Sequence, residues 1–133
     1  MSTGEKAAFW VVTGAASGIG AAVVRAARRS GANVLALDVD EAKGLALASE
    51  TGALFRRCDI SDMAQWQQLV EFLNAAKTEF GAPTHIHLNA GIQIAPPTAP
   101  LSEYLLEAVS LERYRRMMSV NVDGVVFGLQ SLL

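Results

Sequence analysis

Three glycines stand close together near the start of the chain, in the segment TGAASGIG that occupies residues 13–20. The apolar run Ala7–Thr13 leads into this segment, and helical periodicity begins at Gly18. Glycine adopts backbone angles that side chains forbid, and it lets a ligand approach the backbone closely. Free amides and the positive end of a helix dipole then face an anion. A strand, a glycine turn and a helix in this order predict a binding site for a diphosphate.

Asp38 ends the next apolar run, Asn33–Asp38, and is a second group that could contact such a ligand. A carboxylate in this place can accept hydrogen bonds from the ribose hydroxyls of adenosine. It would repel a 2′-phosphate by roughly 4 kcal/mol, for unit charges about 4 Å apart at an effective dielectric of 20. We therefore expect NAD to be preferred over NADP. Two simpler interpretations stay open: Asp38 could only cap the following helix, and the glycines could form an ordinary turn.

The elements that would position these residues are short apolar runs alternating with longer amphipathic segments. Strands are expected at Ala7–Thr13, Asn33–Asp38, Ala53–Arg57 and Thr84–Leu88. Helices are expected at Gly18–Ser30, at Asp40–Thr51, from an N-cap at Ser61 to Gly81, and after an N-cap at Ser110. The prolines in Gly91–Pro100 mark a loop. This alternation predicts a parallel sheet with right-handed crossovers and helices on both faces.

Composition limits the class of protein. The chain has 133 residues, 51% of them hydrophobic, a formal net charge of -2 and one cysteine. These values fit a single domain over residues 1–133 and exclude a disordered chain. We expect no nucleic-acid partner, because there is no basic excess, and no membrane span, because no apolar run is long enough. The lone cysteine suits a reducing compartment, so a cytoplasmic location is expected.

These segments together resemble the short-chain dehydrogenase/reductase family over nearly the whole chain. Residues 13–20 match the family's TGxxxGxG loop, which implies cofactor contacts by Gly14, Ser17, Gly18, Ile19 and Gly20. Asp59 and Ile60 match an acidic and an aliphatic residue that meet the adenine amino group and flank the adenine ring. Asn89, Ala90 and Gly91 match the NNAG segment beside the nicotinamide ribose, with Leu88 in place of the first asparagine.

The resemblance implies a three-layer Rossmann-type fold with a parallel sheet in strand order 3-2-1-4, truncated before the fifth strand. Asn121 lies in a segment similar to the family's N-x-x-G, where the asparagine supports a water-linked proton relay to the catalytic lysine. From the residues alone, Asn89–Gly91 could be a simple turn, and Asn121 could be a structural amide that satisfies a nearby backbone group.

The activity implied by the resemblance is hydride transfer between NAD and an alcohol or carbonyl substrate. In the family, a serine and a Tyr-x-x-x-Lys pair beyond the fifth strand supply the acid–base chemistry. Ala108 and Met118 stand four residues after Tyr104 and Tyr114, so we expect this chain alone to be inactive. Two alternatives remain: a complete, non-catalytic nucleotide-binding or interaction module, and a chain whose tyrosine and lysine come from a separate polypeptide.

Two surfaces are expected to lack cover. The fourth strand would be an unpaired sheet edge, which invites pairing with another chain. Leu129, Leu132 and Leu133 of the last helix would each forgo roughly 1.5–3 kcal/mol of burial if exposed. We therefore expect either a homo-oligomer that covers the fourth strand and the last helix, or a longer protein of which this chain is the front.

Other side chains carry weaker predictions. His85 and His87 share one face of the fourth strand, but no further ligands have a matching spacing, so we expect no metal site. We expect core or near-core positions for Cys58, Trp10, Trp66 and Tyr114. Solvated positions, with an interface role open, are expected for Arg113, Arg115 and Arg116.

Overall fold

The computed structural model describes residues 4–133, and its centre is a four-stranded parallel sheet. The strands are β1 Phe9–Thr13, β2 Asn33–Asp38, β3 Leu54–Arg57 and β4 His85–His87. Their order is β3-β2-β1-β4, which confirms the predicted order 3-2-1-4. β1 pairs with β2 from Phe9 opposite Asn33 to Thr13 opposite Leu37, so the carboxyl ends of the two strands meet at one edge.

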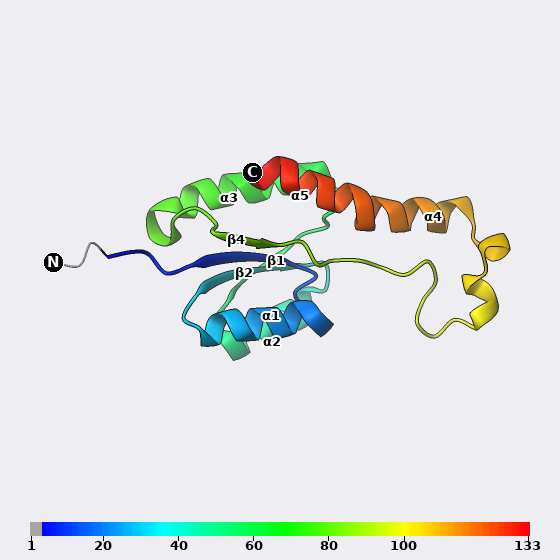
Figure 1. The fold of residues 1–133 in the computed structure, drawn as a ribbon, viewed down its shortest axis with the longest axis horizontal. Helices are drawn as coiled ribbons and strands as arrows, with labels where there is room; N and C mark the ends of the chain where they lie inside the picture. Colours follow the sequence, from blue (N-terminus) through cyan, green and yellow to red (C-terminus); the bar gives the residue numbers. More distant parts are fainter. Residues whose placement is uncertain (1–3) are drawn as a thin grey trace.

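Helices cover both faces of the sheet (Figure 1). One face carries α1 Gly18–Arg29 and α2 Glu41–Thr51, and the other carries α3 Met63–Phe80 and α5 Gly124–Leu132. Alternate side chains of β1 enter different cores: Val11 packs with Trp66 of α3, and Val12 packs with Val24 of α1. Burial on both faces explains why the strands read as continuous apolar runs rather than alternating ones.

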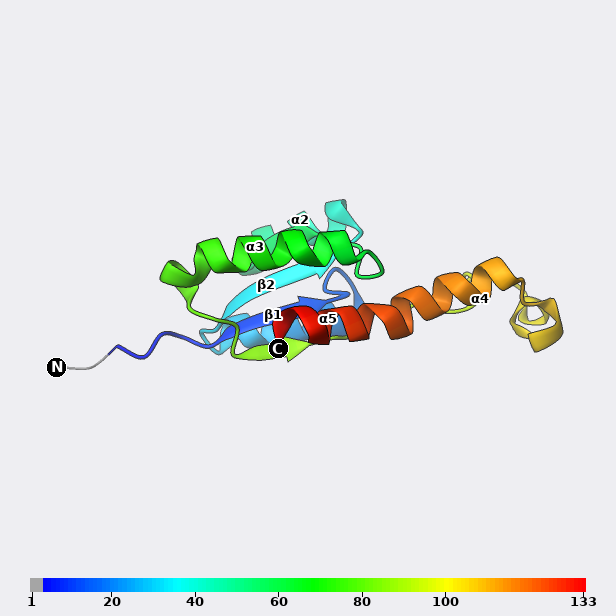
Figure 2. The ribbon, with the colours of Figure 1, turned by 90° about the horizontal axis from the view of Figure 1, so that it is seen from above.

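The last helical segment is less regular than the sequence suggests. Helix α4, Leu111–Met118, begins at Ser110, whose side chain accepts a hydrogen bond from the Arg113 amide as predicted. A π-helical turn at Ser119–Asp123 joins α4 to α5. α4 extends beyond the sheet, and two short 3-10 turns, Leu101–Tyr104 and Leu106–Ala108, lie at its far end (Figure 2). None of the helices within residues 4–133 combines the length and the apolar character that a membrane span requires.

Two local expectations were wrong. Asp62, not Ser61, caps α3 by accepting a hydrogen bond from the Ala64 amide, while the Ser61 hydroxyl donates to Asp59. Tyr114 is not a core residue, since it is 47% exposed on the part of the helix that projects beyond the sheet. The expected burial of Trp66 is confirmed, and Trp10 is half-buried.

Trp66 fastens the turn after β3 to the core, and this contact can be tested. Its side chain is fully buried, and the indole N–H donates to the Ile60 carbonyl at 2.8 Å. We expect Trp66→Phe to lower the free energy of unfolding by about 1–3 kcal/mol, because the buried carbonyl loses its partner. Urea unfolding measures the change, with Trp10→Phe as the half-buried control. Equal losses in the two variants would contradict a special role for the indole hydrogen bond.

Candidate functional site

The glycine segment forms the turn between β1 and α1. Gly14 and Gly18 have positive φ angles of 62° and 54°. A Cβ atom at Gly14 would lie 2.7 Å from Ala90 Cα, and one at Gly20 would lie 2.1 Å from the Gly14 carbonyl oxygen. Neighbouring backbone therefore excludes side chains at Gly14 and Gly20, whereas at Gly18 the positive φ alone favours glycine.

The amino end of α1 lacks a side-chain cap. Ser17 occupies the N-cap position, but its side chain makes no hydrogen bond to the helix amides. By contrast, side-chain oxygens of Asp40, Asp62 and Ser110 cap the helices α2, α3 and α4. The first-turn amides of α1 can thus serve an external anion, which the helix dipole also favours.

Asp38 joins the end of β2 to the glycine turn. Its Oδ2 atom accepts a hydrogen bond from the Ala16 amide at 2.9 Å, and its Oδ1 atom accepts one from the Asp40 amide at 3.0 Å. Asp40 itself caps α2, so helix capping does not account for Asp38. The carboxylate instead fixes the glycine turn and lines the cavity beside it.

The segment after β4 supports the glycine turn from the other side. The buried Thr13 hydroxyl accepts hydrogen bonds from the amides of Asn89 and Ala90 at 3.0 and 3.1 Å. The Asn89 side-chain amide donates to the carbonyls of Thr13 and Gly14 at 3.3 and 3.4 Å. Asn89 therefore stabilises the glycine turn. The segment after β4 is hydrogen-bonded to the glycine turn, so it is not an independent, simple turn.

Asp59 and Ile60 follow β3. Asp59 Oδ1 accepts hydrogen bonds from the Ser61 amide at 3.0 Å and from the Ser61 hydroxyl at 2.6 Å. The Arg116 guanidinium, from α4, donates to the Ser61 hydroxyl at 3.1 Å and lies 3.7 Å from Asp59 Oδ2. Partial burial acts to raise the pKa of Asp59, but the Ser61 hydrogen bonds and the charge of Arg116 hold that pKa below its ordinary value.

These elements enclose a cavity of about 190 Å³ at the carboxyl ends of the strands. The predicted residues that line it are Gly14, Ser17, Asp38, Asp59, Ile60, Ala90 and Gly91. The predicted residues outside its wall are Gly18, Ile19, Gly20 and Asn89, which lie in the first turn of α1 and after β4. Sequence reasoning missed the lining residues Val39, Cys58, Ile92, Arg116 and Val120.

Arg116 makes a contact that the sequence did not predict. Its side chain is 51% exposed, in line with the expected solvated surface, yet it also reaches the cavity and Asp59. No local pattern signals this contact, because residues 59–61 and 116 meet only through the tertiary position of α4.

Asn121 lies in the π-helical turn between α4 and α5. Its Oδ1 atom accepts a hydrogen bond from the Ile92 amide at 2.8 Å, and its Nδ2 atom donates to the Ile92 carbonyl at 2.9 Å. The residue is exposed. The pair of bonds holds the loop after β4 against the last helix, which is the structural role left open above.

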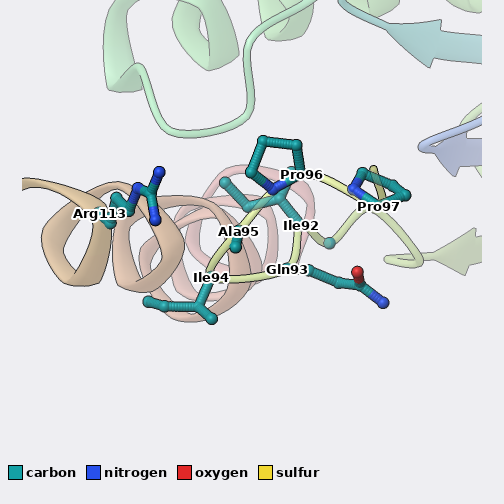
Figure 3. A pocket seen from close by; sticks show the side chains of 8 residues that line it. Ile92, Gln93, Ile94, Ala95, Pro96, Pro97 and Arg113 are labelled. Atoms are coloured by element: carbon teal, nitrogen blue, oxygen red, sulfur yellow. The ribbon is translucent and has the colours of Figure 1, made fainter. Parts of the chain in front are cut away.

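A larger hollow adjoins the cavity. It measures about 550 Å³ and is lined by residues 91–97 and Arg113 (Figure 3). Apolar side chains such as Ile92, Ile94 and Pro96 make up most of its wall, and Glu103 pairs with Arg113 at 2.8 Å. Gly91 and Ile92 line both spaces, so the two are neighbours at this end of the sheet.

The two histidines of β4 lie apart from this site. His85 stacks on Trp10 with ring centroids 4.4 Å apart, and His87 shares a hollow with Trp10 and α1. Over residues 4–133, no group of three or more His, Cys, Asp or Glu side chains is placed to hold a metal ion.

Comparison with known protein families and sequences gives a consistent match. The family described as short chain dehydrogenase matches residues 8–133. The chain is 40% identical over 116 residues to the 2,5-dichloro-2,5-cyclohexadiene-1,4-diol dehydrogenase of Sphingobium indicum, a match that covers 86% of this chain and 42% of that protein. It is 37% identical over 115 residues to the L-fucose dehydrogenase of Oryctolagus cuniculus, covering 86% of this chain and 37% of that protein.

Solved structures give the same picture. The 3-ketoacyl-(acyl-carrier-protein) reductase of Brucella melitensis complexed with NADH matches with a TM-score of 0.81 and 32% identity, over 96% of this chain and 49% of that one. A glucose/ribitol dehydrogenase-type protein of the same organism matches with a TM-score of 0.77 and 27% identity, over 94% and 50%. The chain therefore spans about half or less of the length of these relatives.

Cys58, the one cysteine of the sequence, is a probe of the cavity that it lines. It is 4% exposed. Its burial, and to a smaller extent the negative charge of Asp59, raise the pKa of the thiol from 9.0 to about 11. The thiolate is the reactive form, so Ellman's reagent at pH 8 should modify the native chain about a hundredfold more slowly than the urea-unfolded chain. Similar rates in both states would mean that the end of β3 is open in solution.

Proposed function

This chain belongs to the short-chain dehydrogenase family, and from that premise we propose that it forms the dinucleotide-binding part of an NAD-dependent oxidoreductase. The observation that carries the proposal is the cavity at the carboxyl ends of the strands. The uncapped end of α1 and the glycine turn bound it on one side, and Asp59 and Ile60 bound it on the other. Ligands of open parallel sheets bind at such a place, where the strand order reverses.

The glycine turn supplies the anion site of the proposed cofactor. The pyrophosphate would lie against the backbone of Gly14, Ser17, Gly18, Ile19 and Gly20, where the absence of side chains and the α1 dipole both favour it. The tight packing of Gly14 on Ala90 and of Gly20 on Gly14 supports this fit, because a Cβ atom would displace the turn that forms the cradle.

Asp38 is proposed to select the adenosine ribose. Its carboxylate lines the cavity and would accept hydrogen bonds from the ribose hydroxyls, while a 2′-phosphate would be repelled. The preference for NAD over NADP follows from this charge.

The remaining site residues are assigned to the two ends of the dinucleotide. Asp59 would accept a hydrogen bond from the adenine amino group, and Ile60 would flank the ring. The segment Asn89, Ala90 and Gly91 would lie beside the nicotinamide ribose, with Asn89 bracing the turn. Asn121 is proposed to serve the proton relay of the complete active site, from a place fixed by Ile92.

The proposed reaction is hydride transfer to or from an alcohol or carbonyl carbon. The nicotinamide would donate the hydride to a carbonyl carbon or accept it from an alcohol carbon, and the residues of this chain would bind and orient the dinucleotide. Neither Tyr104 nor Tyr114 is followed by a lysine four positions later, so the family's acid–base pair would lie outside these 133 residues. We assign residues 1–133 to a single dinucleotide-binding domain of a cytoplasmic protein.

Self-association is a further part of the proposal. Val122, Val126 and Leu129 of the last helical segment are 43%, 44% and 43% exposed, and Leu133 is 92% exposed. β4 pairs with β1 on one side. A second copy that covers the β4 edge and α5 would bury this apolar surface.

Titration calorimetry tests the binding site. We expect the chain to bind NADH at least about tenfold more tightly than NADPH, because roughly 1.4 kcal/mol of charge repulsion suffices for that ratio. Asp38→Asn keeps an oxygen acceptor for the Ala16 amide but removes the charge, so it should reduce the preference to about threefold or less. Asp40→Asn makes the same charge change at the α2 cap and serves as the control.

Two results would contradict the proposal at different points. Equal affinity of the parent chain for NADH and NADPH would remove the selecting role of Asp38 and leave the site intact. Failure of the folded parent chain to bind either dinucleotide would overturn the proposed function.

A further inference from the structure

Arg116 is the one cation among the residues that line the cavity within residues 4–133, and the proposed function gives it no role. We propose that Arg116 and Ser61 form a relay that positions Asp59 to select the 6-amino group of the adenine ring. Arg116 would thereby be a specificity-determining positioning residue. This inference rests on the proposed function, since it concerns the same dinucleotide site.

The hydrogen bonds of the relay can run in only one direction, from Arg116 to Ser61 and from Ser61 to Asp59. A guanidinium group has N–H donors and no acceptor. The Ser61 oxygen must therefore accept from Arg116 at 3.1 Å, which directs its own hydrogen to Asp59 Oδ1 at 2.6 Å. Arg116 thus fixes the rotation of the Ser61 hydroxyl, and through it the orientation of the carboxylate.

The relay also determines which carboxylate oxygen can meet a ligand. Oδ1 already accepts from both the amide and the hydroxyl of Ser61. Oδ2 lies 3.7 Å from Arg116, which is too long for a hydrogen bond but close enough for charge attraction. Oδ2 is therefore the atom with lone pairs available to a donor in the cavity.

The backbone of Asp59 is held independently of α4. Its amide donates to the Gln65 side chain at 2.7 Å, and the next carbonyl, that of Ile60, accepts from Trp66 at 2.8 Å. Both partners belong to α3. Loss of Arg116 should therefore loosen the carboxylate, which the Ser61 amide still holds at Oδ1, without releasing the backbone that carries it.

The chemistry of this oxygen determines the selected ligand. An ionised carboxylate only accepts hydrogen bonds, so it pairs with the 6-amino group of adenine. A 6-oxo purine, hypoxanthine, presents an acceptor at the same place and would face an oxygen with no proton to offer. A site built to pair with a donor rejects the analogue that lacks it. Because Asp59 is 26% exposed, water reduces the contrast.

The test compares NADH with reduced nicotinamide hypoxanthine dinucleotide, in which an oxo group replaces the 6-amino group and the adjacent N1 atom carries a proton. Calorimetry should give the parent chain at least about a tenfold preference for NADH. Arg116→Gln and Ser61→Ala should each lower the preference to about threefold or less. The double variant should lower it no further, because both substitutions break one relay.

Arg115→Gln is the matched control. It removes the same charge from the adjacent position of α4, which does not line the cavity, so the preference should stay at the parent value. Arg116→Lys keeps the charge and a donor and should restore part of the preference. Circular dichroism and the urea midpoint check that each variant is folded, as the exposure of Arg116 leads us to expect.

The contradicting outcomes separate this inference from the proposed function. If the parent chain binds NADH and Arg116→Gln keeps the full preference, the relay has no selecting role. If Arg116→Gln weakens both ligands equally, Arg116 acts as a general counter-charge and the inference is also wrong. If the parent chain binds neither ligand, the proposed function fails and this inference fails with it.

Discussion

The site depends on one steric constraint: there is no room for a side chain between the glycine turn and the segment after β4. A Cβ atom at Gly14 would strike the Ala90 backbone, and one at Gly20 would strike the Gly14 carbonyl. Thr13 and Asn89 then hold the two segments together, because the side chain of each is hydrogen-bonded to the backbone of the other. This contact brings the carboxyl end of β4 beside the open end of α1. The cavity is the space left where these two ends and β3 converge.

Asp38 couples the shape of this cavity to its charge. The carboxylate that lines the cavity is also the acceptor for the Ala16 amide in the glycine turn. Hydrogen bonds to charged acceptors contribute about 1.5–3 kcal/mol. Removal of the side chain would therefore alter the turn as well as the electrostatic potential, whereas an amide in its place would alter mainly the potential. Ligand selection and loop geometry are thus two consequences of one group.

Patterns confined to neighbouring residues could be predicted from the sequence. The bounds of β2, the cap at Ser110 and the glycine turn depend on local periodicity and backbone chemistry, and the structure places them as predicted. The exposure of Tyr114 and the contact of Arg116 with the cavity could not be predicted this way. Both depend on how far α4 projects beyond the sheet, and that distance is set by the packing of α5 and by a π-helical turn with no clear sequence signal.

The placement of α4 can be traced to two glycines of α5. A Cβ atom at Gly124 would lie 2.5 Å from Ile60 Cδ1, and one at Gly128 would lie 3.0 Å from the Trp66 ring. Because these two positions carry no Cβ atom, α5 packs directly on the turn after β3. From α5 the helical segment runs back through the π-helical turn to α4, which lies beside Asp59. Asn121 of the π-helical turn is hydrogen-bonded to Ile92, and Arg116 of α4 is hydrogen-bonded to Ser61. Larger residues in α5 would lift α4 from the cavity, so the polar contacts at the adenine end depend on close apolar packing one helix away.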